Sequence, residues 1–125
     1  MTDRLSAYAP QALAVLRIVA ALLFVLHGTQ KLLGFPAAEF APPVFSIFWF
    51  AAIIEIVTGV LIGVGFFTRA AAFIASGTMA VAYWMVHAPG NLFPTNNGGD
   101  AAILFCFLFL FLVFAGPGRW AVNEK

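Results

Sequence analysis

Residues 17–34 read RIVAALLFVLHGTQKLLG, an apolar stretch long enough to cross a membrane as a helix, yet with polar side chains inside it. At about 100° per residue, one stripe of this helix carries Arg17, Phe24, Gly28 and Lys31, with His27 close beside it. A charged side chain deep in hydrocarbon costs roughly 2.5–3.5 kcal/mol, so such residues usually face a bundle interior or a wet cavity. We therefore expect this stripe to face the other helices of a bundle.

The composition excludes a soluble domain. Hydrophobic residues make up 63% of the 125 residues and charged residues only 9%, against roughly 25% in soluble domains. Four apolar segments account for most of the chain, which predicts an all-α fold: a single integral membrane domain built as a four-helix bundle. The expected spans are residues 11–33, 45–66, 70–86 and 101–115. This leaves no room for an extramembrane catalytic domain, and a net charge of +1 gives no reason to expect a nucleic-acid partner.

The basic residues predict the orientation of the bundle. Those outside the spans lie in the N-terminal tail, the second connection and the C-terminal segment: Arg4, Arg69, Arg119 and Lys125. The first and third connections contain no Lys or Arg and one acid each, Glu39 and Asp100. By the positive-inside rule, both termini are expected on the cytoplasmic side of a multi-pass protein. The first apolar run contains Arg17 and lacks an A-x-A-like end, so we interpret it as a retained span rather than a cleaved signal.

One basic and one acidic residue are expected inside the predicted spans. Arg17 lies in the inner half of the first span and Glu55 near the middle of the second. One hypothesis is an intramembrane ion pair, Arg17 with Glu55, which holds these two spans together; breaking such a buried pair is strongly destabilising. The other is a polar centre that binds a ligand headgroup or relays protons. The sequence leaves both open.

A second group of polar residues lies towards the outer end of the bundle. His27, Gln30 and Lys31 share one face of the first span because their spacings are three and four. With His87 and Asn97 nearby, they are candidates to hydrogen-bond the carbonyls of a quinone that enters from the lipid. In the alternative, Lys31 extends to the outer interface and His27 bonds a backbone carbonyl.

Haem and metal are not expected. Haem would need His27 and His87 at matched depth, but His27 lies about two turns inside its span and His87 at the edge of another. No closely spaced set of His, Cys and carboxylate residues predicts a metal site. The lone Cys106 excludes an internal disulfide and a CxxC pair.

Small residues predict close helix packing. Gly59 and Gly63 form a GxxxG pair in the second span, and the third span begins with a run of Ala, Ser and Gly at 70–77. We expect the small residues of the third span to pack against these glycines. The segment GPGRW at 116–120 is interpreted as a helix stop and an interfacial anchor, without chemistry.

Four segments, taken together and in order, resemble the DoxX family over nearly the whole chain. They are LRIVAALLFVLHGTQKLLGF (16–35), EIVTGVLIGVGFFTRAAA (55–72), HAP followed by NNGGD (87–100), and AGPGRW (115–120). Asp100 stands where Glu is commoner in the family, and AVNEK replaces the usual ending. The resemblance implies a small four-helix protein of the bacterial inner membrane. It also implies a link with quinone-dependent oxidation, because a related large subunit belongs to a thiosulfate:quinone oxidoreductase.

From this resemblance we expect an accessory membrane subunit of a quinone-linked redox or respiratory system, with quinone bound in the outer half of the bundle. It would be a component of an oxidoreductase rather than a stand-alone enzyme, and we assign no catalytic residue, because no residue set in the chain supplies electron transfer unaided. The alternative is a non-catalytic docking or assembly subunit of a larger complex. Membrane lipid and a protein partner, or a second copy of the chain, are the expected neighbours.

Overall fold

The computed structural model describes residues 2–37 and 42–125, so Glu39 lies outside the described residues. The described residues form helices joined by turns, with no strand among them. The helices are α1 (Thr2–Ser6), α2 (Ala9–Leu33), α3 (Ile47–Val64), α4 (Thr68–Ala82), the π-helix η1 (Tyr83–His87), the 3-10 helix η2 (Ala88–Gly90), α5 (Pro94–Asn97) and α6 (Asp100–Ala115). The predicted all-α fold is confirmed.

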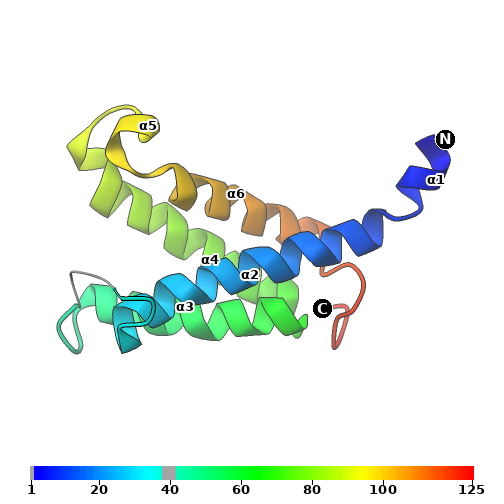
Figure 1. Ribbon diagram of the computed structural model, residues 1–125, viewed down its shortest axis with the longest axis horizontal. Helices are drawn as coiled ribbons and strands as arrows, with labels where there is room; N and C mark the ends of the chain where they lie inside the picture. The colour runs from blue at the N-terminus through cyan, green and yellow to red at the C-terminus, as the bar shows by residue number, and fades with distance from the viewer. Residues whose placement is uncertain (1, 38–41) are drawn as a thin grey trace.

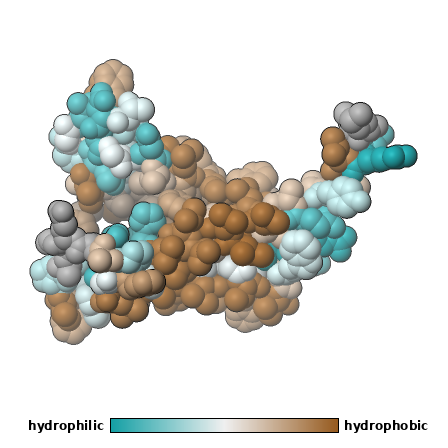
Figure 2. Space-filling view, viewed as in Figure 1, coloured by the Kyte–Doolittle hydropathy of each residue, from teal (hydrophilic) through white to brown (hydrophobic). Residues whose placement is uncertain are grey.

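The helices have the length and composition of a membrane bundle. The helical runs Ala9–Leu33, Ile47–Val64 and Thr68–Gly90 are each long and apolar enough to cross a membrane, and Asp100–Ala115 is a shorter apolar helix. Hydrophobic residues gather along the middle of the molecule over α2 and α3, and hydrophilic residues gather towards its two ends (Figure 2). Three to four apolar helices therefore fit a membrane bundle. The cytoplasmic location of both termini stays a prediction.

The bundle consists of two helix pairs. Helix α2 packs mainly against α3, and α4 packs mainly against α6. The two pairs converge at the end of the molecule where the C-terminal segment lies, and they diverge at the other end (Figure 1). We call the first the tail end, after residues 116–125. We call the second the loop end, after the connections at 34–46 and 88–99.

Glycines allow the close approach of α2 and α3. A Cβ atom added to Gly28 would lie 2.7 Å from Cγ1 of Ile56 and 2.8 Å from the carbonyl oxygen of Ala52. A Cβ added to Gly59 would lie 2.5 Å from Cγ2 of Val25. At Gly28 the backbone of Ala52 blocks a Cβ, so this helix spacing requires glycine, whereas at Gly59 a Cβ would require the Val25 side chain to move.

The small residues of α4 have a different partner from the one expected. They pack on α6 rather than on the glycines of α3. Ala72 and Ala75 are buried in one core cluster with Phe109 of α6, and Ser76 Oγ donates to the carbonyl oxygen of Cys106 at 2.7 Å. The physical reason is that the glycine face of α3 is already filled by the side chains of α2.

Arg17 joins α2 to the segment after α6. The residue is fully buried. Its Nη1 donates to the carbonyl oxygens of Pro117 and, at 2.9 Å, Arg119, and its Nη2 donates to that of Trp120 at 2.9 Å. Residues 117–120 therefore do more than end a helix, because their backbone supplies the acceptors that a buried guanidinium needs.

The rest of the C-terminal segment closes the tail end. The N–H of Val122 donates to the carbonyl oxygen of Val64 at 3.1 Å, so the segment reaches the end of α3. The N–H of Arg69, in the first turn of α4, donates to the carbonyl oxygen of Lys125 at 3.1 Å, and its Nη1 donates to that of Val113 in α6 at 2.8 Å. All four long helices are thus tied together at this end by backbone acceptors.

A pair of glycine variants tests the packing of α2 on α3. Gly28→Ala is expected to destabilise the protein by about 1–3 kcal/mol, because the added methyl overlaps Ile56 and the backbone of Ala52. Gly77→Ala is the matched control, since a Cβ there meets nothing within 4 Å. Because alanine is the better helix former, Gly77→Ala is expected to leave stability unchanged or raise it by up to about 1 kcal/mol. Unfolding in micelles titrated with dodecyl sulfate, followed by circular dichroism, measures both; equal losses would contradict the packing.

Arg17→Ala is expected to lower the free energy of unfolding by about 3 kcal/mol, because it leaves several carbonyl groups without a donor. It should also make the segment after α6 sensitive to protease. Arg119→Ala is the control, because the Arg119 side chain is exposed while its backbone carbonyl, the acceptor, is unchanged. Similar protease sensitivity of wild type and Arg17→Ala would contradict this role of Arg17.

Candidate functional site

A cavity of about 840 Å³ lies between the two helix pairs at the loop end. Residues of α2, α3, α4, η1 and α6 line it, and most of them are apolar, including Phe48, Met79, Met85 and Phe105. The polar side chains among the described lining residues are those of His27, Lys31, Glu55, Thr78 and His87. The cavity is therefore an apolar chamber with a few polar groups in its walls.

An ion pair in the cavity wall joins α2 and α3. Lys31 Nζ lies 2.9 Å from Glu55 Oε1, and the side chains are 34% and 1% exposed respectively. The other carboxylate oxygen, Oε2, is buried and has no hydrogen-bond partner among the described residues. The pair leaves no net charge in the wall, but it leaves one acceptor unused.

The expected pair of Arg17 with Glu55 is not formed. Arg17 bonds to the carbonyls after α6, and Glu55 pairs with Lys31. The reason is the register of α2 on α3: a Cβ added to Gly28 would lie 3.2 Å from Glu55 Cβ, which places Gly28 level with Glu55. Lys31 is one turn from Gly28, whereas Arg17 lies eleven residues before it, about 16 Å along the helix. A long side chain does not span that distance.

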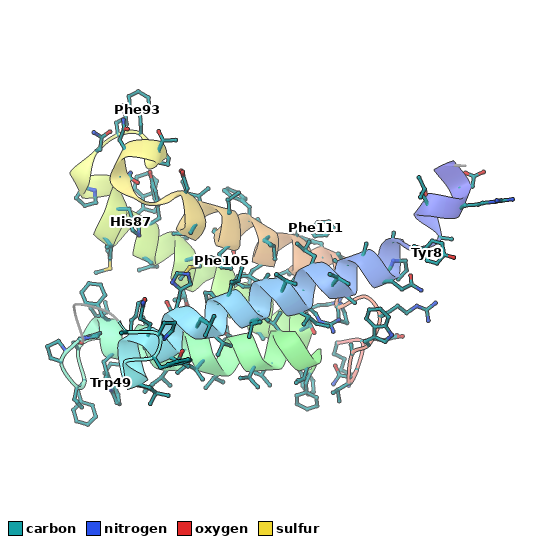
Figure 3. All side chains as sticks on the ribbon, viewed as in Figure 1. Tyr8, Trp49, His87, Phe93, Phe105 and Phe111 are labelled. Carbon is teal, nitrogen blue, oxygen red and sulfur yellow. The ribbon has the colours of Figure 1, made fainter. Side chains whose placement is uncertain are left out.

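Aromatic rings form the deep part of the cavity. The ring of His27 meets that of Phe105 edge to face, with centroids 5.8 Å apart, and Phe105 in turn packs on Phe24 and Phe109 at 5.5 and 5.7 Å. Phe105 lies between the two helix pairs (Figure 3). Phe24 and Phe109 are fully buried, so this cluster ends the cavity on the side of the tail end.

His87 is placed by an irregular turn of helix. It ends η1, in which the N–H of Ala88 donates to the carbonyl oxygen of Tyr83, five residues earlier. Such π-turns change the direction of the side chains that follow and occur often at functional sites. His87 Nδ1 lies 3.2 Å from the carbonyl oxygen of Asn97. A carbonyl oxygen only accepts, so Nδ1 is the donor of this hydrogen bond, and in the imidazole tautomer with its proton on Nδ1 the other nitrogen, Nε2, is an acceptor.

Two of the residues predicted from the sequence belong to the loops beside the cavity. Asn97 Nδ2 donates to the hydroxyl oxygen of Tyr83 at 3.1 Å, and Asn97 Oδ1 accepts from the N–H of Gly99 at 2.8 Å. Gln30 Nε2 donates to the carbonyl oxygen of Ala37 at 3.4 Å, in the connection after α2. Both side chains therefore form hydrogen bonds to backbone groups of the connections at the loop end. The other predicted candidates of the loop end, His27, Lys31, Glu55 and His87, do line one cavity.

Three lining residues were not singled out from the sequence. Gly77 leaves open space where a side chain would be, Thr78 Oγ1 donates to the carbonyl oxygen of Ile74 at 2.8 Å, and Phe105 forms the deep wall. Glycine in a helix interior costs about 1 kcal/mol relative to alanine, which is the one sequence signal that marks Gly77 as special. The run of small residues around it favoured a packing role instead.

The site offers hydrogen bonds and one ion pair rather than metal ligands. Within residues 2–37 and 42–125, no group of three or more His, Cys, Asp or Glu side chains is close enough to hold a metal ion. The polar groups can orient a small molecule, and the aromatic and aliphatic walls can bury its apolar part.

Comparison with known proteins identifies relatives by sequence. The DoxX family model matches residues 12–88, more than half of the chain. An uncharacterised protein of Haemophilus influenzae is 43% identical over 132 aligned positions, which cover 98% of this chain and 96% of that protein. No solved structure was found to match the chain. The matched region includes most of α2 and all of α3, α4 and η1, and therefore most of the cavity wall.

Lys31→Met is expected to lower the free energy of unfolding by about 3 kcal/mol, because it leaves the buried Glu55 carboxylate without its cation. The double variant Lys31→Met/Glu55→Gln is the control, since removing both charges restores a neutral wall and should recover most of the loss. Unfolding in mixed micelles measures the coupling between the two residues. Additive effects of the two substitutions would show that the ion pair is not formed in the folded protein.

Proposed function

Because the chain belongs to the DoxX family, we propose that it is an accessory membrane subunit of a quinone-linked redox system and binds the quinone in the cavity at the loop end. The observation that carries this proposal is the cavity itself. Its volume of about 840 Å³ falls within the roughly 300–1,000 Å³ typical of small-molecule sites, and its walls are apolar with few polar groups. Such a cavity suits a ligand with a flat apolar ring and a few polar oxygen atoms.

The polar groups suit the oxygens of such a ring. Lys31 Nζ uses one of its three N–H groups on Glu55, so two remain for an acceptor on the ligand. Phe105 and Phe48 supply aromatic surface in the same chamber, against which a ring can stack. A quinone that binds here would be oriented by Lys31 on one side and by the aromatic wall on the other.

The surroundings of the cavity suit a ligand that arrives through lipid. The cavity lies between helix pairs that fit a membrane bundle, and several of its lining residues are exposed at the surface, among them His27, Phe50 and Gly77. No side-chain set in the described residues carries electrons, so oxidation or reduction of the quinone would be completed by the cofactor of a partner protein. The subunit's own part is to bind and orient.

A cavity-filling variant tests the proposal without touching any polar group. Gly77→Leu places a side chain in open space inside the cavity and is expected to abolish quinone binding while preserving stability. Ile74→Phe adds bulk to the same helix at an exposed position outside the cavity and should bind normally. The measurements are organic extraction of the gently purified protein followed by mass spectrometry, and titration with decylubiquinone.

Quinone that extracts with wild type and Ile74→Phe but not with Gly77→Leu would support the site. Absence of extracted quinone, together with no binding of added decylubiquinone to wild type, would overturn the proposal. That result would favour the alternative hypothesis, a non-catalytic docking or assembly subunit of a larger complex.

A further inference from the structure

We propose that the cavity prefers the reduced form of its ligand, the hydroquinone, over the oxidised quinone, and that Glu55 is the residue that makes this distinction. The inference rests on the proposed function, because it concerns the same cavity. Beyond the proposed function, it names the redox form of the ligand that the cavity prefers and the hydrogen bond that causes the preference. The cavity wall leaves several hydrogen-bond acceptors unused, and a ligand can satisfy them.

The first unused group is a carboxylate oxygen of Glu55. The Glu55 side chain is 1% exposed, its Oε1 accepts from Lys31, and its Oε2 has no partner among the described residues. A buried acceptor without a donor is unfavourable, so a ligand that brings a donor gains the bond that the protein lacks. Glu55 lines the cavity, and the preference of the last side-chain torsion of Glu is broad, so Oε2 can turn towards a ligand there.

The opposite wall also offers acceptors. His87 Nδ1 donates to the carbonyl oxygen of Asn97, which leaves Nε2 of the neutral ring as an acceptor. Thr78 Oγ1 donates its one hydrogen bond to the carbonyl oxygen of Ile74, so towards a ligand it can only accept. Both residues line the cavity. A ligand with hydroxyl groups at opposite ends of a ring would satisfy acceptors on both walls.

The donors in the wall do not cancel this preference. Lys31 keeps two N–H groups, but a hydroxyl oxygen accepts from them as a carbonyl oxygen does. The two redox forms therefore differ only at the acceptors, which the hydroquinone satisfies and the quinone leaves unpaired. A site with unpaired acceptors rejects an analogue that lacks the matching donor far more strongly than an apolar pocket does.

The charges in the wall favour a neutral donor over a cation. Lys31 already balances Glu55 at 2.9 Å, and the described lining residues include no other Asp, Glu, Lys or Arg. An ammonium ligand would add an uncompensated charge to a largely apolar chamber, whereas a hydroxyl group adds none. The unused acceptors and the balanced charges thus point to a neutral, hydroxyl-bearing amphiphile.

The test compares one molecule in its two redox forms. Dissociation constants are measured for decylubiquinol and decylubiquinone with the full chain in detergent, without oxygen. Wild type is expected to bind the quinol about tenfold more tightly, the size of one charge-assisted hydrogen bond. In Glu55→Gln this ratio should fall below about threefold. Because that variant leaves Lys31 unpaired and can fold poorly, Thr78→Val provides a second variant, which removes an acceptor without touching the ion pair and should also lower the ratio.

The outcomes separate the two proposals. Equal binding of both forms, or tighter binding of the quinone, with both abolished by Gly77→Leu, would overturn the preference for the reduced form and leave the cavity as a quinone site. Failure of wild type to bind either form would overturn both. A preference for the quinol that persists unchanged in Glu55→Gln and Thr78→Val would overturn the assignment of Glu55 and of the acceptor wall.

Discussion

The guanidinium of Arg17 needs acceptors, and in this bundle it obtains them from backbone. A fully buried charge in an apolar helix is costly unless its donors are satisfied, and the carbonyl groups of Pro117, Arg119 and Trp120 accept from Nη1 and Nη2. The buried Nε of Arg17 has no partner among the described residues. Those carbonyls belong to a short segment without regular structure, which such a contact can hold in place. The residues after this segment bond to the ends of α3 and α4, and Arg69 bonds to α6, so these contacts together fix how the four long helices meet.

The contacts that tie the helices together at the tail end allow a cavity at the loop end. The helices are tied together at the tail end, while α2 and α6 contact each other little along their length. The two pairs can therefore diverge towards the loop end and enclose a cavity without losing their association. Lys31 and Glu55 hold the first pair together within the cavity wall, and the π-turn before His87 completes the second. The cavity follows from this asymmetry.

The helices could be predicted from the sequence because hydrophobic periodicity and helix-ending residues are local signals. The partners of charged residues could not, since they depend on the register between helices: Gly28 fits against Glu55, which makes Lys31 and not Arg17 its neighbour. The sequence did not predict that the segment after α6 binds Arg17, because the acceptors are main-chain carbonyl groups, which every residue type carries. Four of the six candidate residues, His27, Lys31, Glu55 and His87, line the cavity. Gln30 and Asn97 instead bond to backbone carbonyl groups of the connections at the loop end.

The contact of Arg17 with the carbonyl of Pro117 joins residues that are 100 positions apart. During synthesis the first long helix is made well before the segment whose carbonyl groups accept from Arg17. A membrane-inserted intermediate would carry the Arg17 cation without these acceptors for most of that time. Before then α2 can pack on α3 through the glycine contacts and the Lys31–Glu55 ion pair, but the carbonyl groups that accept from Arg17 are missing. The hydrogen bonds of Arg17 that tie α2 to the tail end thus form only after residues 117–120 have been translated.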